Sequence, residues 1–230
     1  MAGRRIMLAV SAVACLASVI SLMREYPAAV FARDDSFLKL NILSQSDTLQ
    51  SAQVGLPGIP DVPMSWRGQR DLLRGCSDVQ SDTTFQFMPA DTRASTHQNC
   101  LDVAQQVLDR APTVGLAHLV QAVAFDGLGR AQERDRALAV SQAHASFEGW
   151  QAIRRIRVGL PALDTLSTDA RAALSADIAF LMIERWGIEQ IAPLFISLPD
   201  AREFIESVAQ QAKPQSQRQL ISALRRYAQG

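Results

Sequence analysis

The sequence has 230 residues, enough for one domain with a hydrophobic core in addition to an N-terminal apolar segment. Its 23 basic and 23 acidic side chains cancel, and a formal net charge of zero argues against a nucleic-acid partner held by bulk charge. Aromatic residues make up 6% of the chain, while alanine and leucine are abundant. This composition favours packed helices over sheets, so we expect an all-α fold.

Residues 6–23 form an uncharged apolar run, and Arg4 and Arg5 stand directly before it. A helix that rises about 1.5 Å per residue over this length nearly crosses the ~30 Å hydrocarbon core of a bilayer. Paired arginines before such a run keep the N-terminus in the cytoplasm. We therefore expect a single-pass anchor in a bacterial inner membrane, followed by a C-terminal domain in the periplasm.

A cleaved signal peptide is the alternative to a retained anchor. Residues 30–32 offer a cleavage site with Val30 and Ala32 at its two key positions. The apolar run, however, exceeds the usual signal core of roughly 7–15 residues. Arg24 and Glu25 also intervene before the site. These two features favour retention of residues 1–23 as a transmembrane helix.

Residues 24–64 are expected to form a stalk or linker. Residues 37–43 fit the period of a helix and of a strand equally well. Residues 54–63 contain three prolines and two glycines, which exclude regular structure. The folded domain is expected over residues 65–230. Cys76 and Cys100 lack the CxxC spacing and would lie in an oxidising compartment, so they predict a structural disulfide rather than two buried free thiols.

The pattern of the domain is helical almost throughout. Ser65 predicts the cap of a short helix over residues 65–75, and residues 77–89 a polar loop that carries Phe85 and Phe87. The next helices are expected from an Asp91 cap to Arg110, from a Thr113 cap to a stop at residues 127–129, and over residues 131–145. Two more are expected from Ser146 to residues 159–161 and from Ser167 through Trp186. The last ones are expected over residues 188–198, from a capping box of Ser197, Pro199 and Asp200 to Pro214, and around Leu220 and Leu224. Their short connections make them antiparallel neighbours.

The spacing of residues 92–145 resembles a tetratricopeptide repeat. Its small, bulky and proline positions are occupied by Cys100, Ala104, Val107 and Pro112, and the next helix pair carries Ala122, Phe125, Leu128 and Gly129. His118, Gln121 and Arg134 depart from the pattern. The resemblance implies a right-handed stack of antiparallel helix pairs with a groove that binds an extended segment or a helix of a partner.

No catalytic signature accompanies these helices. The chain lacks GxSxG, HExxH, Walker A and GxGxxG motifs. Its three histidines are not spaced to converge on a metal ion, so we expect no catalytic residue, metal or cofactor. Arg154, Arg155 and Arg157 form the densest positive cluster, with Arg154 and Arg157 on one helix face. This face predicts a dock for an acidic glycan, a lipid phosphate or an acidic protein segment, or else a solvated surface.

We therefore expect a non-enzymatic adaptor that is held at the membrane and contacts a membrane or periplasmic protein in a cell-envelope assembly, such as one for surface polysaccharide synthesis or export. The candidate binding residues are Trp150, Arg154, Arg157, His118 and Gln121. An envelope hydrolase that cleaves peptidoglycan or another glycan, and a small-ligand sensor, are the alternatives.

Overall fold

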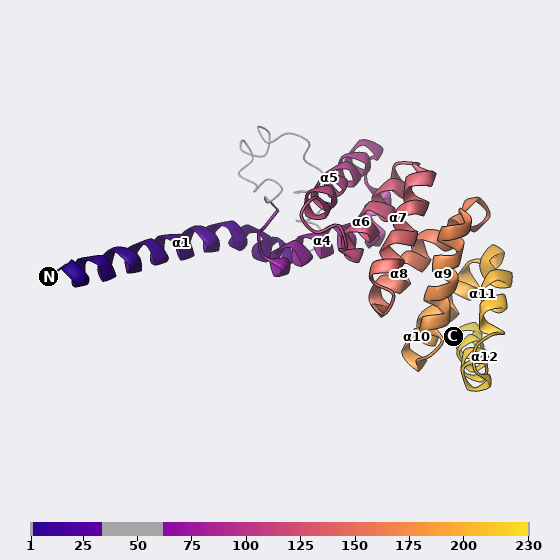
Figure 1. The fold of residues 1–230 in the computed structure, drawn as a ribbon. Helices are drawn as coiled ribbons and strands as arrows, with labels where there is room; N and C mark the ends of the chain where they lie inside the picture. Colours follow the sequence, from indigo (N-terminus) through magenta and orange to yellow (C-terminus); the bar gives the residue numbers. More distant parts are fainter. Residues whose placement is uncertain (1, 34–61, 230) are drawn as a thin grey trace. The chain divides into compact units, whose positions relative to one another are not determined.

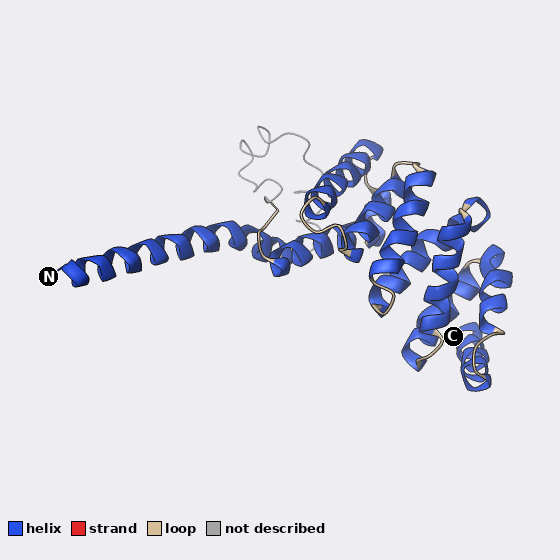
Figure 2. Ribbon diagram, viewed as in Figure 1, coloured by secondary structure: helices blue, strands red, loops and turns tan. Residues whose placement is uncertain are grey.

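The computed structural model describes residues 2–33 and 62–229. Over these residues the regular structure consists of α-helices and short 3-10 helices, without a strand (Figure 2), which confirms the expected all-α class. The predictions for residues 37–43 and for most of 54–63 lie outside the described residues. The chain divides into two compact units, Met1–Asn99 and Cys100–Gly230.

The first unit begins with the long helix α1 (Ala2–Arg33), drawn in indigo in Figure 1. The side chains of residues 10–23 are all exposed, and they include Val13, Leu16 and Leu22. Within the described parts of the chain, no helix satisfies the length and apolarity that crossing a membrane requires. The N-terminal anchor therefore stays a prediction.

Helix α4 (Trp66–Ser81) packs on α1, and the N-terminal end of α4 is capped. Ser65 is its N-cap, as predicted, and its hydroxyl oxygen accepts a hydrogen bond from the Gly68 amide at 3.0 Å. The Glu25 carboxylate of α1 accepts hydrogen bonds from the Ser65 amide, at 2.9 Å, and from the Ser65 hydroxyl. One carboxylate of α1 thereby fixes the start of α4.

The prediction of a loop over residues 77–89 is wrong. Helix α4 continues to Ser81, and a 3-10 helix, η1 (Thr83–Phe87), follows it. No glycine or proline interrupts residues 76–81, and the buried stripe of Leu72, Cys76 and Val79 keeps helical spacing. Phe85 is buried with its ring edge-on to His97, whereas Phe87 is exposed. Helix α5 (Ala90–Leu108) begins next.

The second unit is an antiparallel arrangement of helices that follow α5 (Figure 1). Its elements are α6 (Gly115–Gly127), α7 (Ala131–His144), α8 (Gly149–Gly159), η2 (Leu160–Thr165), α9 (Thr168–Leu181), α10 (Arg185–Ser197), η3 (Pro199–Ala201), α11 (Arg202–Ala209) and α12 (Pro214–Gln229). Helix α6 packs on α7 and α8 on α9, while α6 also touches α8 and α7 touches α9. The fold is thus helical repeat-like, and α12 covers α10 at the C-terminal end.

Several helix ends lie where the sequence predicts them. Ser167 caps α9 and accepts a hydrogen bond from the Ala170 amide. Helix α6 ends in a Schellman motif: Gly129 has a φ of +71°, and the Arg130 amide donates to the Phe125 carbonyl at 2.8 Å. Pro214 is the first residue of α12, where its missing N–H costs nothing.

Other predicted ends are wrong. Asp91 lies inside the first turn of α5, and neither Thr113 nor Ser146 caps a helix, since α6 and α8 follow Val114 and Glu148 without a side-chain cap bond. Ala201 stands at the N-cap of α11 with no side-chain bond, so the predicted capping box there is absent. Helices α6, α8 and α11 thus begin without a side-chain cap hydrogen bond.

Trp186 belongs to α10 rather than to the helix that Ser167 opens. Helix α9 ends at Leu181, and the chain turns over residues 182–184, where no glycine or proline signals a break. Gly187 makes the turn possible: a Cβ there would stand 2.2 Å from the Leu181 carbonyl oxygen. A tight approach between two helices, rather than a local stop signal, therefore ends α9.

A buried ion pair joins three helices of the second unit. Arg155 of α8 and Asp177 of α9 are both 0% exposed. The Arg155 Nε and Nη2 atoms each donate to one carboxylate oxygen of Asp177 at 2.7 Å. Arg155 also donates to the Ser141 hydroxyl of α7 and to the Ala145 carbonyl, both at 3.2 Å. Burial raises the pKa of the Asp177 carboxyl, and the bonds from Arg155 oppose that rise.

A second buried charge supports the start of α9. Arg134, at the position where a tetratricopeptide repeat has a small residue, is buried and forms ion pairs with Asp126 at 3.0 Å and with Asp135 at 2.8 Å. The other carboxylate oxygen of Asp135 accepts a hydrogen bond from the Ser167 amide at 2.6 Å. This chain of contacts connects α6 and α7 to the N-cap of α9.

We predict that Arg155→Met lowers the free energy of unfolding by about 3–5 kcal/mol, because it leaves the Asp177 carboxylate buried without its partner. The double variant Arg155→Met/Asp177→Leu should recover most of this loss, since it removes both charges. Chemical denaturation followed by circular dichroism measures both effects.

Arg157→Met is the matched control, because Arg157 is exposed on the same helix; its cost should stay within about 1 kcal/mol. If Arg155→Met is no more costly than Arg157→Met, the pair does not hold the three helices together.

Cys76 and Cys100 are disulfide-bonded, as the sequence predicts, while Cys15 is a free, exposed thiol. The bridge closes a loop of about 25 residues, which in the chain-entropy model stabilises the fold by about 3.5 kcal/mol. We predict that Cys76→Ser/Cys100→Ser lowers the free energy of unfolding by about this amount. Cys15→Ser should change nothing. Equal stabilities of the double variant and the native chain would contradict the prediction.

Candidate binding surfaces

His118 and Gln121, predicted as binding residues, lie half-buried on α6 and contact neighbouring residues. The His118 Nε2 atom lies 3.0 Å from the Pro112 carbonyl oxygen, and its ring stacks on His144 at 5.9 Å between centroids. Gln121 donates a hydrogen bond to Gln105 of α5 at 3.2 Å. Both side chains therefore connect α6 to adjacent elements.

Trp150, Arg154 and Arg157 lie on α8 and form the second group of predicted residues. The Arg154 guanidinium carbon is 5.6 Å from the centroid of the Trp150 ring, a cation–π contact. Arg157 follows Arg154 by three residues and is exposed. Arg155 does not share this surface, because the 3.6-residue period turns it inward beside Ala152 and Ile156. The positive surface of α8 thus consists of Arg154 and Arg157.

Exposed aromatic side chains surround the start of α8. Phe147 is 84% exposed and meets Phe180 of α9 edge-on at 6.0 Å between ring centroids. Trp186 of α10 is 52% exposed and stands against Gly149, where a Cβ would lie 3.0 Å from its ring. The sequence did not predict Phe147 and Trp186 as binding residues, because Phe147 lies in a turn and Trp186 was assigned to the end of the helix that begins at Ser167.

The exposed residues Phe147, Arg157 and Trp186 and the half-buried residues Trp150 and Arg154 lie around the start of α8, and we call them the α8 surface. Aromatic side chains and arginine are the residue types enriched at the energetically dominant positions of protein interfaces. The α8 surface therefore has the composition of a protein-binding surface.

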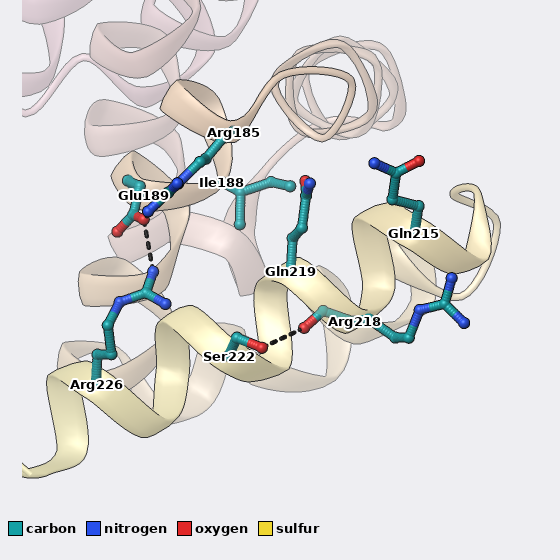
Figure 3. Close-up of a pocket in the computed structure, with 8 residues that line it drawn as sticks. All are labelled: Arg185, Ile188, Glu189, Gln215, Arg218, Gln219, Ser222 and Arg226. Atoms are coloured by element: carbon teal, nitrogen blue, oxygen red, sulfur yellow. Dashed lines mark hydrogen bonds and ion pairs between the residues drawn. The ribbon is translucent and has the colours of Figure 1, made fainter.

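An open recess of about 350 Å³ lies between α10 and α12 (Figure 3). It is lined by polar and charged side chains around Ile188, namely Arg185, Glu189, Gln215, Arg218, Gln219, Ser222 and Arg226. Glu189 pairs with Arg226 at 2.5 Å and with Arg185 at 3.6 Å. Two arginines thus share one carboxylate.

A second, less polar recess of about 650 Å³ lies along α9. Small side chains of that helix, Ala172, Ala176 and Ala179, form one wall, and Val208 of α11 and Ala212 contribute to the rest. Lys213 is its one charged lining residue. This recess offers shape and apolar contact but few directed hydrogen bonds.

No cluster of three or more histidine, cysteine, aspartate or glutamate side chains is placed to hold a metal ion among the described residues. The buried carboxylate Asp177 lines neither recess and is held by Arg155.

The fold and these surfaces define a class, a helical repeat-like all-α protein, without defining a family. Comparisons with protein-family models, with curated proteins and with solved structures find no match.

Proposed function

We propose that this protein is a membrane-anchored adaptor that binds a protein partner through the α8 surface. The observation that carries the proposal is the exposure of aromatic rings beside two arginines: Phe147 and Trp186 lie open beside the helix that carries Arg154 and Arg157. Exposed large aromatic side chains cost solvation free energy, and clusters of them typically mark contact sites.

The pairing of helices supports a groove-binding mode. Helices α6 and α8 touch each other, as do α7 and α9, which is the neighbour relation of a tetratricopeptide-like stack. In such stacks the outer side of the first helices lines a groove for an extended segment or a helix. Arg154 and Arg157 favour an acidic partner segment, for which Trp150 and Phe147 supply apolar anchors.

Helix α1 supports attachment to a membrane. The exposed side chains of residues 10–23 are apolar on every side of the helix, apart from the serines, and residues 6–23 carry no charge. An apolar surface of this kind is stable in lipid but not in water. The partner is then a membrane or periplasmic protein of the cell envelope.

We predict that the α8 surface crosslinks to a discrete partner in intact cells. A photoreactive amino acid at position 157 should yield one crosslinked species, which Arg154→Glu/Trp186→Ala in the same chain abolishes. Circular dichroism of the variant verifies that it is folded. Mass spectrometry identifies the partner.

The matched control places the photoreactive residue at Arg136, which is exposed on α7 outside the α8 surface. It should not yield the crosslinked species. If both positions give the same products, or if the variant folds and crosslinks as the native chain does, the α8 surface is not the binding site.

We also predict that the mature protein keeps residues 1–23. It should fractionate with membranes, resist carbonate extraction, and show the mass of the full chain. A soluble species that starts at Arg33 would contradict the anchor while leaving the α8 surface in place.

A further inference from the structure

We propose that the recess between α10 and α12 binds a phosphoryl group, as an anion-binding site separate from the α8 surface and independent of the proposed adaptor function. Figure 3 shows its two ends: Arg226, Glu189 and Arg185 lie near one another, while Arg218 and Gln215 lie at the opposite end of the recess. Ile188 and Gln219 stand between the two ends.

The charges of the recess do not balance. Arg185, Arg218 and Arg226 contribute three positive charges, and Glu189 is the one acidic residue that lines it. Glu189 is only 28% exposed, and its Oε1 atom faces both Arg226 and Arg185, so one negative charge is divided between two guanidinium groups. The surplus of two positive charges matches the charge of a phosphate monoester, roughly −1.5 to −2 near neutral pH.

The hydrogen-bonding groups point to the same class of ligand. A guanidinium group has five N–H donors and no acceptor. Arg218 makes no hydrogen bond or ion pair through its guanidinium group with any other described residue; only its backbone carbonyl is used, as the acceptor for the Ser222 hydroxyl at 2.9 Å. The Arg185 side chain is 78% exposed and lies 3.6 Å from Glu189, beyond hydrogen-bond distance. Donors thus exceed acceptors among the lining side chains, and a ligand rich in oxygen acceptors complements them.

The residue types favour phosphate over a simple carboxylate. All the cations that line the recess are arginines, whose planar fork matches the oxygens of a phosphate, and Gln215 and Gln219 add neutral amide donors. A recess of about 350 Å³ also lies within the range of small-ligand sites, so it has room for the group that carries the phosphate. That group belongs either to a water-soluble metabolite or to a lipid headgroup.

Isothermal titration calorimetry of the purified full-length chain in neutral detergent, with pyrophosphate as the probe, tests the proposal. We expect saturable binding that weakens as the salt concentration rises. Arg218→Gln and Arg226→Gln should each weaken binding about tenfold, because each removes charge-assisted hydrogen bonds. Arg218→Gln is the stricter test, since it breaks no ion pair of the recess.

Arg225→Gln is the matched control. Arg225 adjoins Arg226 on α12 and is exposed, but it does not line the recess. Its removal changes the net charge of the protein as Arg226→Gln does, and it should leave the affinity unchanged. Absence of saturable binding, or an equal loss in Arg225→Gln and Arg218→Gln, would overturn the proposal. Circular dichroism of each variant verifies that α12 is folded.

A second titration distinguishes the two sources of the phosphoryl group. Glycerol 3-phosphate and the short-chain lipid dihexanoyl phosphatidic acid carry the same phosphate monoester. Equal affinities support a water-soluble ligand, and an affinity at least about tenfold higher for the lipid supports a headgroup. Both outcomes support a phosphoryl site. If neither compound binds, the proposal is contradicted.

Discussion

One buried ion pair, Arg155 with Asp177, joins three helices of the second unit, and neither partner can be left alone in the apolar interior. A guanidinium group inside a protein is tolerated only when its donors are satisfied, and here an aspartate, a hydroxyl and a carbonyl accept from it. The acceptors are Ser141 of α7, the Ala145 carbonyl directly after α7, and Asp177 of α9. If one of these helices moved away, the Arg155 guanidinium group would lose an acceptor inside an apolar interior. We therefore regard α7, α8 and α9 as one cooperative element, to which the less polar contacts of the other helices are added.

The same pair explains the part of the charge pattern that the sequence leaves open, namely the role of Arg155. Three arginines within four residues resemble a single basic surface, but a helix distributes them around its axis, and Arg155 falls on the buried side. Nothing near Arg155 in sequence identifies Asp177, which lies 22 residues away on another helix. The sequence does predict the all-α class, the disulfide, the Ser65 and Ser167 caps and the stop at Gly129, because each depends on residues close in sequence or on a pairing with few alternatives.

The remaining differences have a common physical cause. The end of α9, the start of α10 and the exposure of Trp186 follow from the approach of Gly187 to Leu181, which is a tertiary contact. The recess between α10 and α12 likewise depends on where the last helix packs, and its arginines look like ordinary surface residues in the sequence. Of the predicted binding residues, Trp150 and Arg154 are brought together, while His118 and Gln121 contact their own neighbours. The candidate site was thus predictable only in part, by the pattern on α8.

If residues 6–23 lie in a bilayer as proposed, the contact of Glu25 with Ser65 has a consequence for the position of α4. Glu25 is two residues past the end of the apolar run, and it holds the first turn of α4 by hydrogen bonds to the Ser65 amide and hydroxyl. With residues 6–23 in a bilayer, the start of α4 would lie at the level of the lipid headgroups, although 40 residues separate it in sequence from Glu25. The contact between the Glu25 carboxylate and Ser65 would then set the distance of α4 from the membrane. The 28 residues between Arg33 and Val62 would not set it. A change in the length of that segment would leave the height of α4 above the lipid unchanged.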